Sequence, residues 1–593
     1  MRQKPGPAGI LLPAFAVAVL LAGQLFTPAH AFSQEGQGAG ATERPSVALV
    51  IRPVVTPAGQ VTDVDVLETV EATPDGGAPF AVRIPVVVAG VPGIADGVHD
   101  LTMSDQGGAV PLQQADDPPD PSNFMYFRNW RATRPVRGAV TVRYRFHLAT
   151  PAPRSGPPFD LRSNGGGVSG AGVGFLVLPD DKRVYSVSMK WDLSGMAPGS
   201  SAMSSLGAGD VQVTMPMEPV AFSFYMAGPL HRYPATGSAG GFSAAWIGEP
   251  PFDADAAMAR SAKAYDALRE FFHDKNPPPF RVLMRTGPDN ISVGGAQLTN
   301  SFMLFLPTDP RLTRDLDGTI AHEMVHHWVE SLEGKPGLIA WWGEGLAEYF
   351  SRIAIFRAGL MTPEEFLANI NRKAVRYYTN PLINLPNDEV PNAFWRDRNG
   401  QVIPYDRGFF YFVDLNRKLL EKSHGKVSID DLVREMIAAR KQGKPPTTES
   451  WLEATRRELG PVAKQEWEST IVKGNTIVPP SDAFGPCFAR KAVKLRQFDL
   501  GFDERASLYT LPRIIHGVEP GSAADAAGLR NGDEVVNILD LDDLRSEPDK
   551  RVELDLRRDG RELKISYLPR ARAVQGYEWV RVAGVPDSRC RAH

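Results

Sequence analysis

Residues 317–328 read DGTIAHEMVHHW and place three histidines within six positions. His322 and His326 are four residues apart, so on a helix both rings leave the same face one turn apart. Two imidazoles at this spacing can bind one tetrahedral metal ion, and Glu323 stands beside the open coordination position as a general base. The alternative is a surface helix with solvated histidines, since HExxH arises by chance in about one such chain in fifty to a hundred. His327 points about 100° away from His326, so we expect it either to support a ligand from behind or to have a structural role.

A second helix is expected to supply the third metal ligand. Gly334 and Pro336 predict the end of the first helix. Glu344 follows His326 by 18 positions, in the segment WWGEGLAEYF, and is expected to begin a helix that folds back antiparallel. Its carboxylate would complete a His2Glu set that holds one Zn2+ per chain and leaves the fourth position to water. Glu348, one turn further, could hold a ligand histidine through its other N–H group, or be an ordinary acid of the helix surface.

The segments HEMVHHW and GEGLAEYF resemble the gluzincin metallopeptidases, whose helix pair carries HExxH and then a glutamate segment. The residue types match the aminopeptidase branch, with one residue fewer between the last histidine and the glutamate than in the larger aminopeptidase family. The order of a β domain, a helical domain and a trailing third domain is most similar to the glycyl aminopeptidase family. The resemblance implies a thermolysin-like, mostly helical peptidase domain and an aminopeptidase that favours small N-terminal residues such as glycine.

Two further segments resemble functional parts of these peptidases. The segment PYDRGF, with its Tyr405 placed 61 residues after the third ligand, is similar to their catalytic tyrosine segment. Its phenol could donate a hydrogen bond to the oxyanion, or the ring could simply pack at a helix start. Gly294, Gly295, Ala296 and Gln297 correspond to their substrate-binding strand, and the glycines fit an edge strand that takes a peptide by β-addition. Gln297 stands where these families carry an acid for the substrate α-amino group, so endopeptidase action by the same mechanism stays open.

The whole chain reads as a multidomain α+β protein. Residues 140–148 alternate apolar and polar side chains, the period of a half-buried strand, and similar runs predict a β-sandwich-like domain. The glycine-rich segment 163–174 does not end as a phosphate-binding loop does, so we expect a mobile loop or a hairpin. The predicted segments are a signal peptide (1–31), a flexible leader (32–44), an N-terminal β domain (45–240), a gluzincin peptidase catalytic domain (241–475) and a PDZ domain with a C-terminal tail (486–593).

The C-terminal segment resembles a PDZ domain. Leu500, Gly501 and Phe502 are similar to its carboxylate-binding loop, and the later GSAADAAGLRNGDEVV to its short helix, turn and next strand. Exposed amides around Gly501 and a neighbouring strand edge would bind a peptide tail or a β segment; the alternative is a PDZ fold that serves only as a structural lid. Cys487 and Cys590 bracket this segment and could form a disulfide in an oxidising compartment, or remain two buried thiols.

Composition and the N-terminus set the expected partners and compartment. The 593 residues carry 65 lysines and arginines against 69 acids, a net charge of −4, so no basic surplus favours nucleic acid. Arg2 and Lys4 precede an apolar run (8–23) and an A-x-A cleavage site at 29–31, as in a secretory signal peptide; the alternative is an uncleaved anchor. No later stretch of sequence reaches 18 uncharged apolar residues. We therefore expect an exported protein, periplasmic or secreted, without a membrane span after cleavage.

These observations predict an exported zinc metallopeptidase that acts on peptides or proteins. A second hypothesis is a catalytically weak peptidase fold whose PDZ domain makes it an adaptor or quality-control protein. A third keeps the zinc but hydrolyses another kind of substrate, as some relatives do with epoxides. Metal content separates the second hypothesis from the others, and cleavage of plain peptides separates the first from the third.

Overall fold

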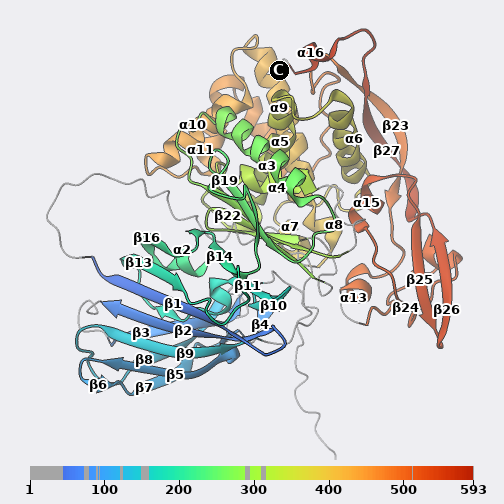
Figure 1. The fold of residues 1–593 in the computed structure, drawn as a ribbon. Coiled ribbons are helices and arrows are strands. Elements are labelled where there is room, and N and C mark those ends of the chain that lie inside the picture. The colour runs from blue at the N-terminus through green and yellow to red at the C-terminus, as the bar shows by residue number, and fades with distance from the viewer. Residues whose placement is uncertain are drawn as a thin grey trace, which may run out of the picture.

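The computed structural model shows an N-terminal β part, a central part of one sheet with many helices, and a C-terminal part (Figure 1). The described residues are 44–71, 79–88, 91–92, 94–119, 125–148, 159–287, 294–308, 316–394, 396–509 and 512–591. The predicted signal peptide, and all but the last residue of the predicted leader, lie outside these residues. No helix within the described ranges is long and apolar enough to cross a membrane.

The N-terminal part consists of sheets that pack around a shared apolar core. One sheet has the order β16 (Val211–Pro216), β13 (Val184–Trp191), β1 (Ser46–Val55), β2 (Val61–Glu71), β9 (Val140–His147), β5 (Val98–Asp105) and β6 (Gly108–Ala109). Another has the order β12 (Leu178–Pro179), β3 (Ala81–Val88), β8 (Met125–Ala132) and β7 (Leu112–Asp116), with β4 (Val91–Pro92) paired to β3. A further sheet has the order β10 (Arg162–Asn164), β11 (Gly167–Ala171), β17 (Phe224–Gly228), β14 (Ser201–Ser204) and β15 (Gly207–Ala208), and α2 (Met217–Ala221) precedes β17.

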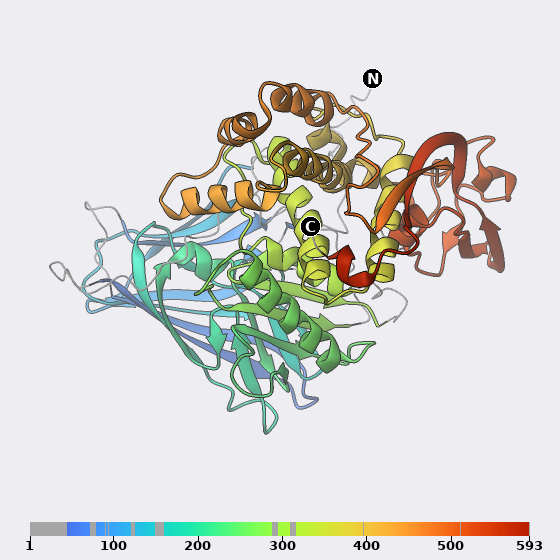
Figure 2. The ribbon, with the colours of Figure 1, turned by 90° about the horizontal axis from the view of Figure 1, so that it is seen from above.

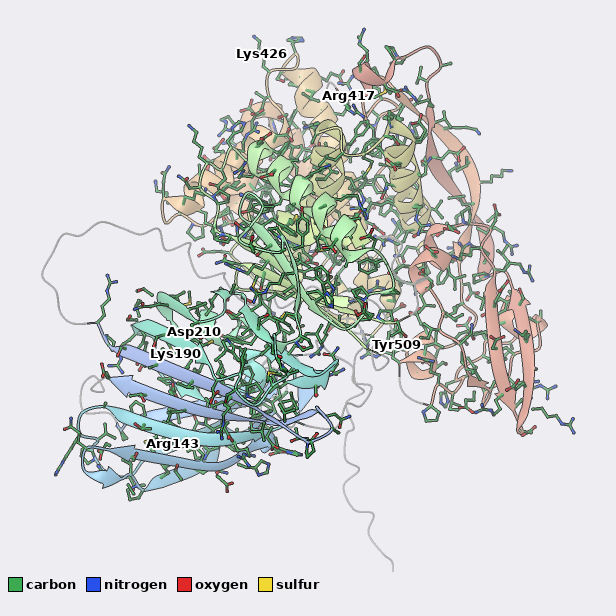
Figure 3. The ribbon with its side chains drawn as sticks, viewed as in Figure 1. Arg143, Lys190, Asp210, Arg417, Lys426 and Tyr509 are labelled. Carbon is green, nitrogen blue, oxygen red and sulfur yellow. A yellow bond between two sulfur atoms is a disulfide. The ribbon has the colours of Figure 1, made fainter. Side chains whose placement is uncertain are left out.

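Strand β9 shows why these segments form sheets. Val140, Val142, Tyr144 and Phe146 are buried in the core, whereas the intervening Arg143 is exposed on the outer face, where Figure 3 labels it. The alternation with a period of two places every second side chain on the apolar side of the sheet. The strand predicted from this alternation is confirmed.

The glycine-rich segment 163–174 is a hairpin, one of its two predicted forms, and it is not a mobile loop. It contains β11 and the last two residues of β10, and residues 167–174 are buried. A Cβ on Gly170 would lie 2.8 Å from the Cα of Leu161, and one on Gly174 would lie 2.2 Å from the carbonyl oxygen of Phe159. Glycine is needed here because neighbouring backbone passes too close for any side chain.

Glu68 is a buried acid in the core of the N-terminal part. It follows Val64 and Val66 at the inward positions of β2, and its side chain is fully buried. Neither carboxylate oxygen has a hydrogen-bond partner among the described residues. Burial raises the pKa of Glu68 to about 8, so the folded protein holds a proton on this carboxyl at neutral pH.

Replacing Glu68 with glutamine is expected to stabilise the protein most at alkaline pH. The unfolded chain loses the proton near pH 4.5 and the folded chain only near pH 8, so the free energy of unfolding falls as the pH rises between these values. At about 1.4 kcal/mol per pKa unit, this loss is on the order of 4–5 kcal/mol. Thermal unfolding should therefore show a higher midpoint for E68Q than for the wild type near pH 8, and a smaller difference near pH 5. Glu71→Gln, an exposed acid of the same strand, is the control, and equal midpoints near pH 8 would contradict the prediction.

The central sheet lies between two cores. Its order is β18 (His231–Tyr233), β19 (Phe242–Ile247), β20 (Phe280–Thr286), β22 (Ser301–Leu306) and β21 (Gly294–Leu298), with β21 antiparallel at the edge. Val282 and Leu304 face the helices, whereas Leu283 and Met303 pack into the N-terminal core. Because both faces are covered, β19 and β22 are apolar nearly throughout. The sheet therefore joins the N-terminal part to the helices that carry the HExxH segment.

The helices of the central part lie on the other side of this sheet, and α3 (Ala254–Phe271) and α4 (Leu316–Val325) pack directly on its strands. The others are α5 (Pro336–Arg357), α6 (Pro363–Thr379), α7 (Val390–Phe394), α8 (Arg398–Gln401), α9 (Ile403–Lys422), α10 (Ile429–Lys441), α11 (Thr448–Leu459) and α12 (Val462–Trp467). Seen from above, they separate the N-terminal sheets from the C-terminal part (Figure 2).

The first predicted helix, α4, is shorter than expected. It ends at Val325, and His326 lies in the turn that follows, where the Trp328 amide donates to the Val325 carbonyl at 2.9 Å. Pro336 does not end α4. It occupies the first turn of α5, where its missing N–H group leaves no helical hydrogen bond unmade. Glu344 consequently lies in the third turn of α5 and does not begin that helix.

The C-terminal part consists of a long antiparallel ribbon and a small sheet. The ribbon pairs β23 (Phe488–Phe498) with β27 (Arg570–Arg581), and the sheet has the order β24 (Glu534–Val535), β25 (Val552–Arg558) and β26 (Arg561–Tyr567). The short helices are α13 (Glu504–Leu508), α14 (Ala523–Ala526), α15 (Leu541–Ser546) and α16 (Asp587–Cys590).

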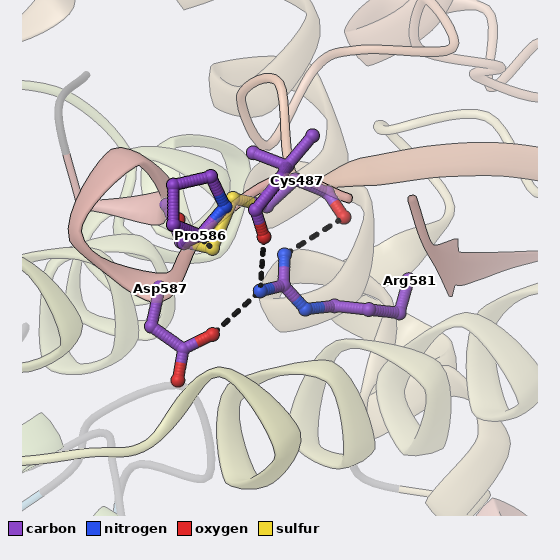
Figure 4. The surroundings of a disulfide bond; sticks show 6 residues. Cys487, Arg581, Pro586 and Asp587 are labelled. Carbon is purple, nitrogen blue, oxygen red and sulfur yellow. Dashed lines mark hydrogen bonds and ion pairs between the residues drawn. A yellow bond between two sulfur atoms is a disulfide. The ribbon is translucent and has the colours of Figure 1, made fainter. Parts of the chain in front are cut away.

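A disulfide between Cys487 and Cys590 ties α16 to the start of the ribbon (Figure 4). Of the two predicted alternatives, the bonded pair is the one found. Arg581 lies beside it and donates hydrogen bonds to the carbonyl of Cys487 at 3.4 Å and to the carboxylate of Asp587 at 2.6 Å. Closing a loop over a sequence separation of 103 stabilises the fold by about 4–5 kcal/mol in the chain-entropy account.

Candidate metal centre

Three ligand atoms meet where α4 ends beside the middle of α5. Nε2 of His322 lies 3.3 Å from Oε2 of Glu344 and 3.2 Å from Nε2 of His326, which lies 3.6 Å from the same oxygen. A tetrahedral zinc ion with bonds of about 2.0–2.1 Å separates its ligand atoms by about 3.3 Å. All three side chains are buried. The structure thus brings the three predicted ligands together as a cluster that can hold a metal ion, and the spacing fits Zn2+.

A close crossing of α5 and α9 sets the width of this site. A Cβ on Gly345 would lie 2.5 Å from the Cα of Gly408, so the two helices approach at a distance that only glycine allows. Glu344 directly precedes the first glycine, and Tyr405 lies about one turn before the second. The glycines of the two sequence motifs therefore bring the third ligand and the tyrosine to the same site. Figure 1 shows α4, α5 and α9 as neighbours in the helical part.

Glu323 lies next to the metal cluster without a partner of its own. It is 1% exposed, and neither carboxylate oxygen makes a hydrogen bond within the described chain. Burial raises its pKa to about 8, although the nearby charge of His326 acts in the opposite direction. A buried carboxyl that lacks a protein partner is placed to exchange a proton with a small molecule at the site.

Tyr405 closes the site from α9. Its ring stacks on that of His322, with centroids 5.9 Å apart and an angle of 22° between the planes. The hydroxyl is buried and makes no hydrogen bond to the described residues. Burial, and then the negative charge of Glu344, raise the pKa of Tyr405 well above its usual range. The phenol therefore keeps its proton and remains a hydrogen-bond donor.

Glu348 lies behind His322, and its burial excludes the alternative of an ordinary surface acid. Its Oε1 atom is 3.7 Å from Nδ1 of His322, too far for a hydrogen bond but close enough for electrostatic attraction. Nη1 of Arg352 lies 2.5 Å, and Nζ of Lys373 2.7 Å, from its other oxygen. Burial acts to raise the pKa of Glu348, but these cations outweigh burial and hold the pKa well below 4.5. The carboxylate beside His322 is therefore ionised.

Strand β21 carries the predicted substrate-binding residues. Gln297 pairs with Phe302 of β22, so its half-buried side chain lies on the face of the sheet that the helices cover. Ala296 points to the opposite face, into the N-terminal core. A Cβ on Gly294 would lie 2.1 Å from the Phe305 ring, and one on Gly295 would lie 2.3 Å from the Phe302 ring. Glycine is therefore needed at both positions, because a side chain there would collide with aromatic rings of β22.

His327 is directed away from the metal cluster, as predicted. Its Nε2 atom lies 3.2 Å from the carbonyl oxygen of Pro278, and its ring packs against those of Tyr265 and Phe280. Burial lowers its pKa to about 4, so the ring is neutral near pH 7. Its role is structural.

The sequence interpretation missed two charged residues around Glu348. Lys373 on α6 and Asp406 on α9 are both buried. The sequence does contain a signal for the lysine, which stands beside Ile370 and Ala374 on the buried face of an amphipathic helix. A lysine on such a face marks an ammonium that is buried and paired.

The predicted carboxylate-binding loop of the C-terminal part lines a cavity, but one of its amides already has a partner within the chain. The amide of Gly501 donates to Oδ1 of Asp499 at 2.8 Å, so a carboxylate of the chain itself occupies it. The side chains of Leu500 and Phe502 are buried in the core of the C-terminal part. The next element is the helix α13 and not a strand, because Asp503 accepts a backbone hydrogen bond as its N-cap. The loop therefore lies between β23, which ends at Phe498, and the helix α13.

A cavity of about 700 Å³ lies between the C-terminal part and α8. Arg398 lines it from the helical side, and Glu504 and Tyr509 from the C-terminal side, where the tyrosine hydroxyl donates to Glu504 at 2.9 Å. Figure 3 labels Tyr509 at this boundary.

The fold and the site together define a class: a β part, a helical part on a mixed sheet, and a buried His2Glu cluster that can hold a metal ion. No protein-family model matches the sequence, and no curated protein matches it. Among solved structures, the chain is similar to an aminopeptidase N family protein from Idiomarina loihiensis. The two share 14% sequence identity and superpose with a TM-score of 0.65, and the match covers 92% of this chain and 99% of that chain.

Two other solved structures are similar over less of the chain. An M1 zinc metallopeptidase from Deinococcus radiodurans shares 18% identity over 73% of this chain and 94% of that chain, with a TM-score of 0.44. The yeast LTA4 hydrolase shares 15% identity over 74% of this chain and 69% of that chain, also with a TM-score of 0.44. At these identities, what is shown is the fold that this chain shares with the Idiomarina protein over nearly its whole length.

Proposed function

We propose that this chain is a zinc-dependent metallopeptidase, and that it acts as an aminopeptidase on peptides or proteins with small N-terminal residues. The observation that carries the proposal is the buried triangle of His322, His326 and Glu344, with Glu323 and Tyr405 beside it. Within the described chain, the polar atoms of these last two side chains have no partner. A purely structural metal site is closed and needs neither a free base nor a free phenol.

The residues of the site divide the chemistry of hydrolysis among them. When bound, Zn2+ supplies a Lewis acid that polarises the scissile carbonyl and lowers the pKa of water. Glu323, whose pKa the positive charge of a bound metal would lower again, accepts a proton from the attacking water and passes it to the leaving amine. Tyr405 donates a hydrogen bond to the substrate oxygen as negative charge develops there. Because these side chains are buried, their electrostatic effects are stronger than they would be in bulk water.

The edge strand β21 is the proposed guide for the substrate backbone. One edge pairs with β22, and the other has no strand neighbour among the described residues, so an extended peptide can add there. The amide oxygen of Gln297 can accept a hydrogen bond from the α-amino group, but it lacks the charge of a carboxylate. That missing charge favours the second candidate function, an endopeptidase that uses the same catalytic residues.

The preference for small residues and the export of the protein are also proposals. The preference is supported by the resemblance to the glycyl aminopeptidase family. Export, to the periplasm or the medium, is supported by the signal-peptide pattern of residues 1–31. The disulfide between Cys487 and Cys590 agrees with it, since such bonds persist in oxidising compartments.

The adaptor hypothesis has less support than the enzyme hypothesis. It needs a peptide groove in the C-terminal part, and the Gly501 amide that should line this groove is bonded to Asp499. A peptide bound to this part would lie in the cavity that Gly501 lines together with Arg398 and Tyr509. Hydrolysis of a substrate other than a peptide needs the same metal cluster, so only an experiment distinguishes this hypothesis from peptide hydrolysis.

A mass-spectrometric cleavage profile tests the proposal. The zinc-loaded protein without residues 1–31 is incubated with a mixed peptide library, and E323Q is the matched blank. We expect the wild type alone to remove single N-terminal residues, glycine and alanine fastest. Internal cuts would identify the endopeptidase. Identical profiles for the two proteins would refute peptidase action and leave the adaptor hypothesis or hydrolysis of another kind of substrate.

A further inference from the structure

A buried lysine outside the metal cluster joins two carboxylates of the site. Lys373 on α6 is 4% exposed. Its Nζ atom lies 2.7 Å from Oε2 of Glu348 on α5 and donates a hydrogen bond of 3.1 Å to Oδ1 of Asp406 on α9. One ammonium therefore links three helices.

Each of these two carboxylates is next to a group of the site. Glu348 lies 3.7 Å from Nδ1 of His322, whose Nε2 atom belongs to the metal cluster. Asp406 directly follows Tyr405 in the first turns of α9. A shift of the ammonium would therefore move a side chain behind a metal ligand and the backbone that carries the phenol.

The lysine is not needed to neutralise these acids. Arg352 lies 2.5 Å from Glu348, and Arg376 lies 2.6 Å from Asp406, so each carboxylate has its own guanidinium. Burying a third cation requires desolvation, and a buried ion pair often adds little to stability. The lysine instead fixes the geometry of the site, because its ammonium holds the carboxylates of Glu348 and Asp406 next to each other.

Helix α6 is itself held in place from its other side. The side-chain amide of Asn371 donates to the Trp579 carbonyl at 2.9 Å and accepts from the Trp579 amide at 2.8 Å. Arg372 forms ion pairs with Asp543 and Glu547. The C-terminal part thus gives the lysine a rigid support.

We propose that Lys373 is a positioning residue of the metal centre, which orients His322 through Glu348 and Tyr405 through Asp406. The kinetic part of this inference rests on the proposed function. The part that concerns metal binding does not, since it is measured on the protein without any substrate.

The test compares Lys373→Met with Lys418→Met. Lys418 is a matched control, because its ammonium also bridges two carboxylates, those of Asp414 and Glu466, at 2.7 Å each. It lies thirteen residues beyond Tyr405, about 20 Å along α9. Zinc affinity is measured by competition with a chelator, and the geometry of the site by the visible absorption of the Co2+-loaded protein.

We expect K373M to bind zinc about 10-fold more weakly than the wild type and to change the Co2+ spectrum, because partners behind a ligand histidine commonly have effects of this size. On a cleaved peptide, kcat should fall about 10-fold with KM within about 2-fold, since the orientation of Tyr405 matters as charge develops. K418M should match the wild type in all four measurements.

A double-mutant cycle separates positioning from a general loss of structure. If Lys373 acts through Glu348, zinc affinity in the double variant with Glu348→Gln should fall no further than in the weaker-binding single variant. Additive losses, or a K373M with the zinc affinity and Co2+ spectrum of the wild type, would overturn the proposal.

If K373M does not fold, the variant Lys373→Arg tests the proposal in its place. The guanidinium keeps the charge but presents a planar fork, so it displaces both carboxylates. We expect K373R to fold with an altered Co2+ spectrum, and a spectrum identical to the wild type would overturn the proposal. If the wild type binds zinc but cleaves nothing, the proposed function fails while the metal measurements still test Lys373.

Discussion

Replacing Glu323 with glutamine is expected to lower kcat by about 10²–10⁴-fold, the range for loss of a general base or acid. Glutamine has nearly the same shape, so the buried position should still be filled. It cannot accept the proton of the attacking water. Because Glu323 does not belong to the triangle of ligand atoms, zinc should remain bound at one ion per chain. Steady-state kinetics on the best peptide, with metal content measured by mass spectrometry, checks both parts.

The matched control is Glu333→Gln, an exposed acid ten residues further along the chain. It should leave kcat and zinc content unchanged. If E323Q loses its zinc together with its activity, Glu323 is a ligand or supports one, and its role as base is wrong. If E323Q keeps its activity, another group takes the proton.

Replacing Tyr405 with phenylalanine is expected to lower kcat by about 10²–10³-fold with little change in KM, as for loss of one donor to a developing oxyanion. The ring that stacks on His322 is retained, so the metal cluster should keep its geometry. Only the hydroxyl, which has no partner within the described chain, is removed. Kinetics at several substrate concentrations separates kcat from KM.

Tyr411→Phe is the control for this substitution, since Tyr411 lies on the same helix and its hydroxyl accepts a hydrogen bond from Trp451 at 3.2 Å. It should change stability slightly and kcat hardly at all. A rise in KM alone for Y405F would mean that the phenol binds the substrate in its ground state and does not act on the transition state.

Local patterns predicted much of the site. The HExxH spacing placed two imidazoles on one side of α4, although His326 lies just past the end of that helix. The alternative that Glu348 is an ordinary surface acid is excluded only by tertiary packing, since α6 packs over its side chain. The alternation of residues 140–148 predicted β9, because a strand with one buried face needs no information beyond its own side chains.

Other predictions were incomplete because a neighbour outside the motif decided the outcome. Leu500, Gly501 and Phe502 read as a free loop, but Asp499 bonds to the amide and Asp503 starts a helix. The glycines around 170 left a mobile loop and a hairpin open, and the hairpin is found because these glycines are sites of close backbone contact. Glycine permits both, and the sequence does not show which one applies.

The sequence by itself predicted the metal ligands and Glu323, since His322, Glu323 and Glu344 belong to one helix pair with short-range geometry, whereas Tyr405 on α9 was predicted only through a family resemblance. Only the tertiary structure decided the environment of Glu68 and the place of Lys373. The first depends on strands that close over β2, and the second on α5, α6 and α9 meeting around one ammonium. Burial and pairing of charge are properties of what packs around a residue, and these neighbours come from distant parts of the chain.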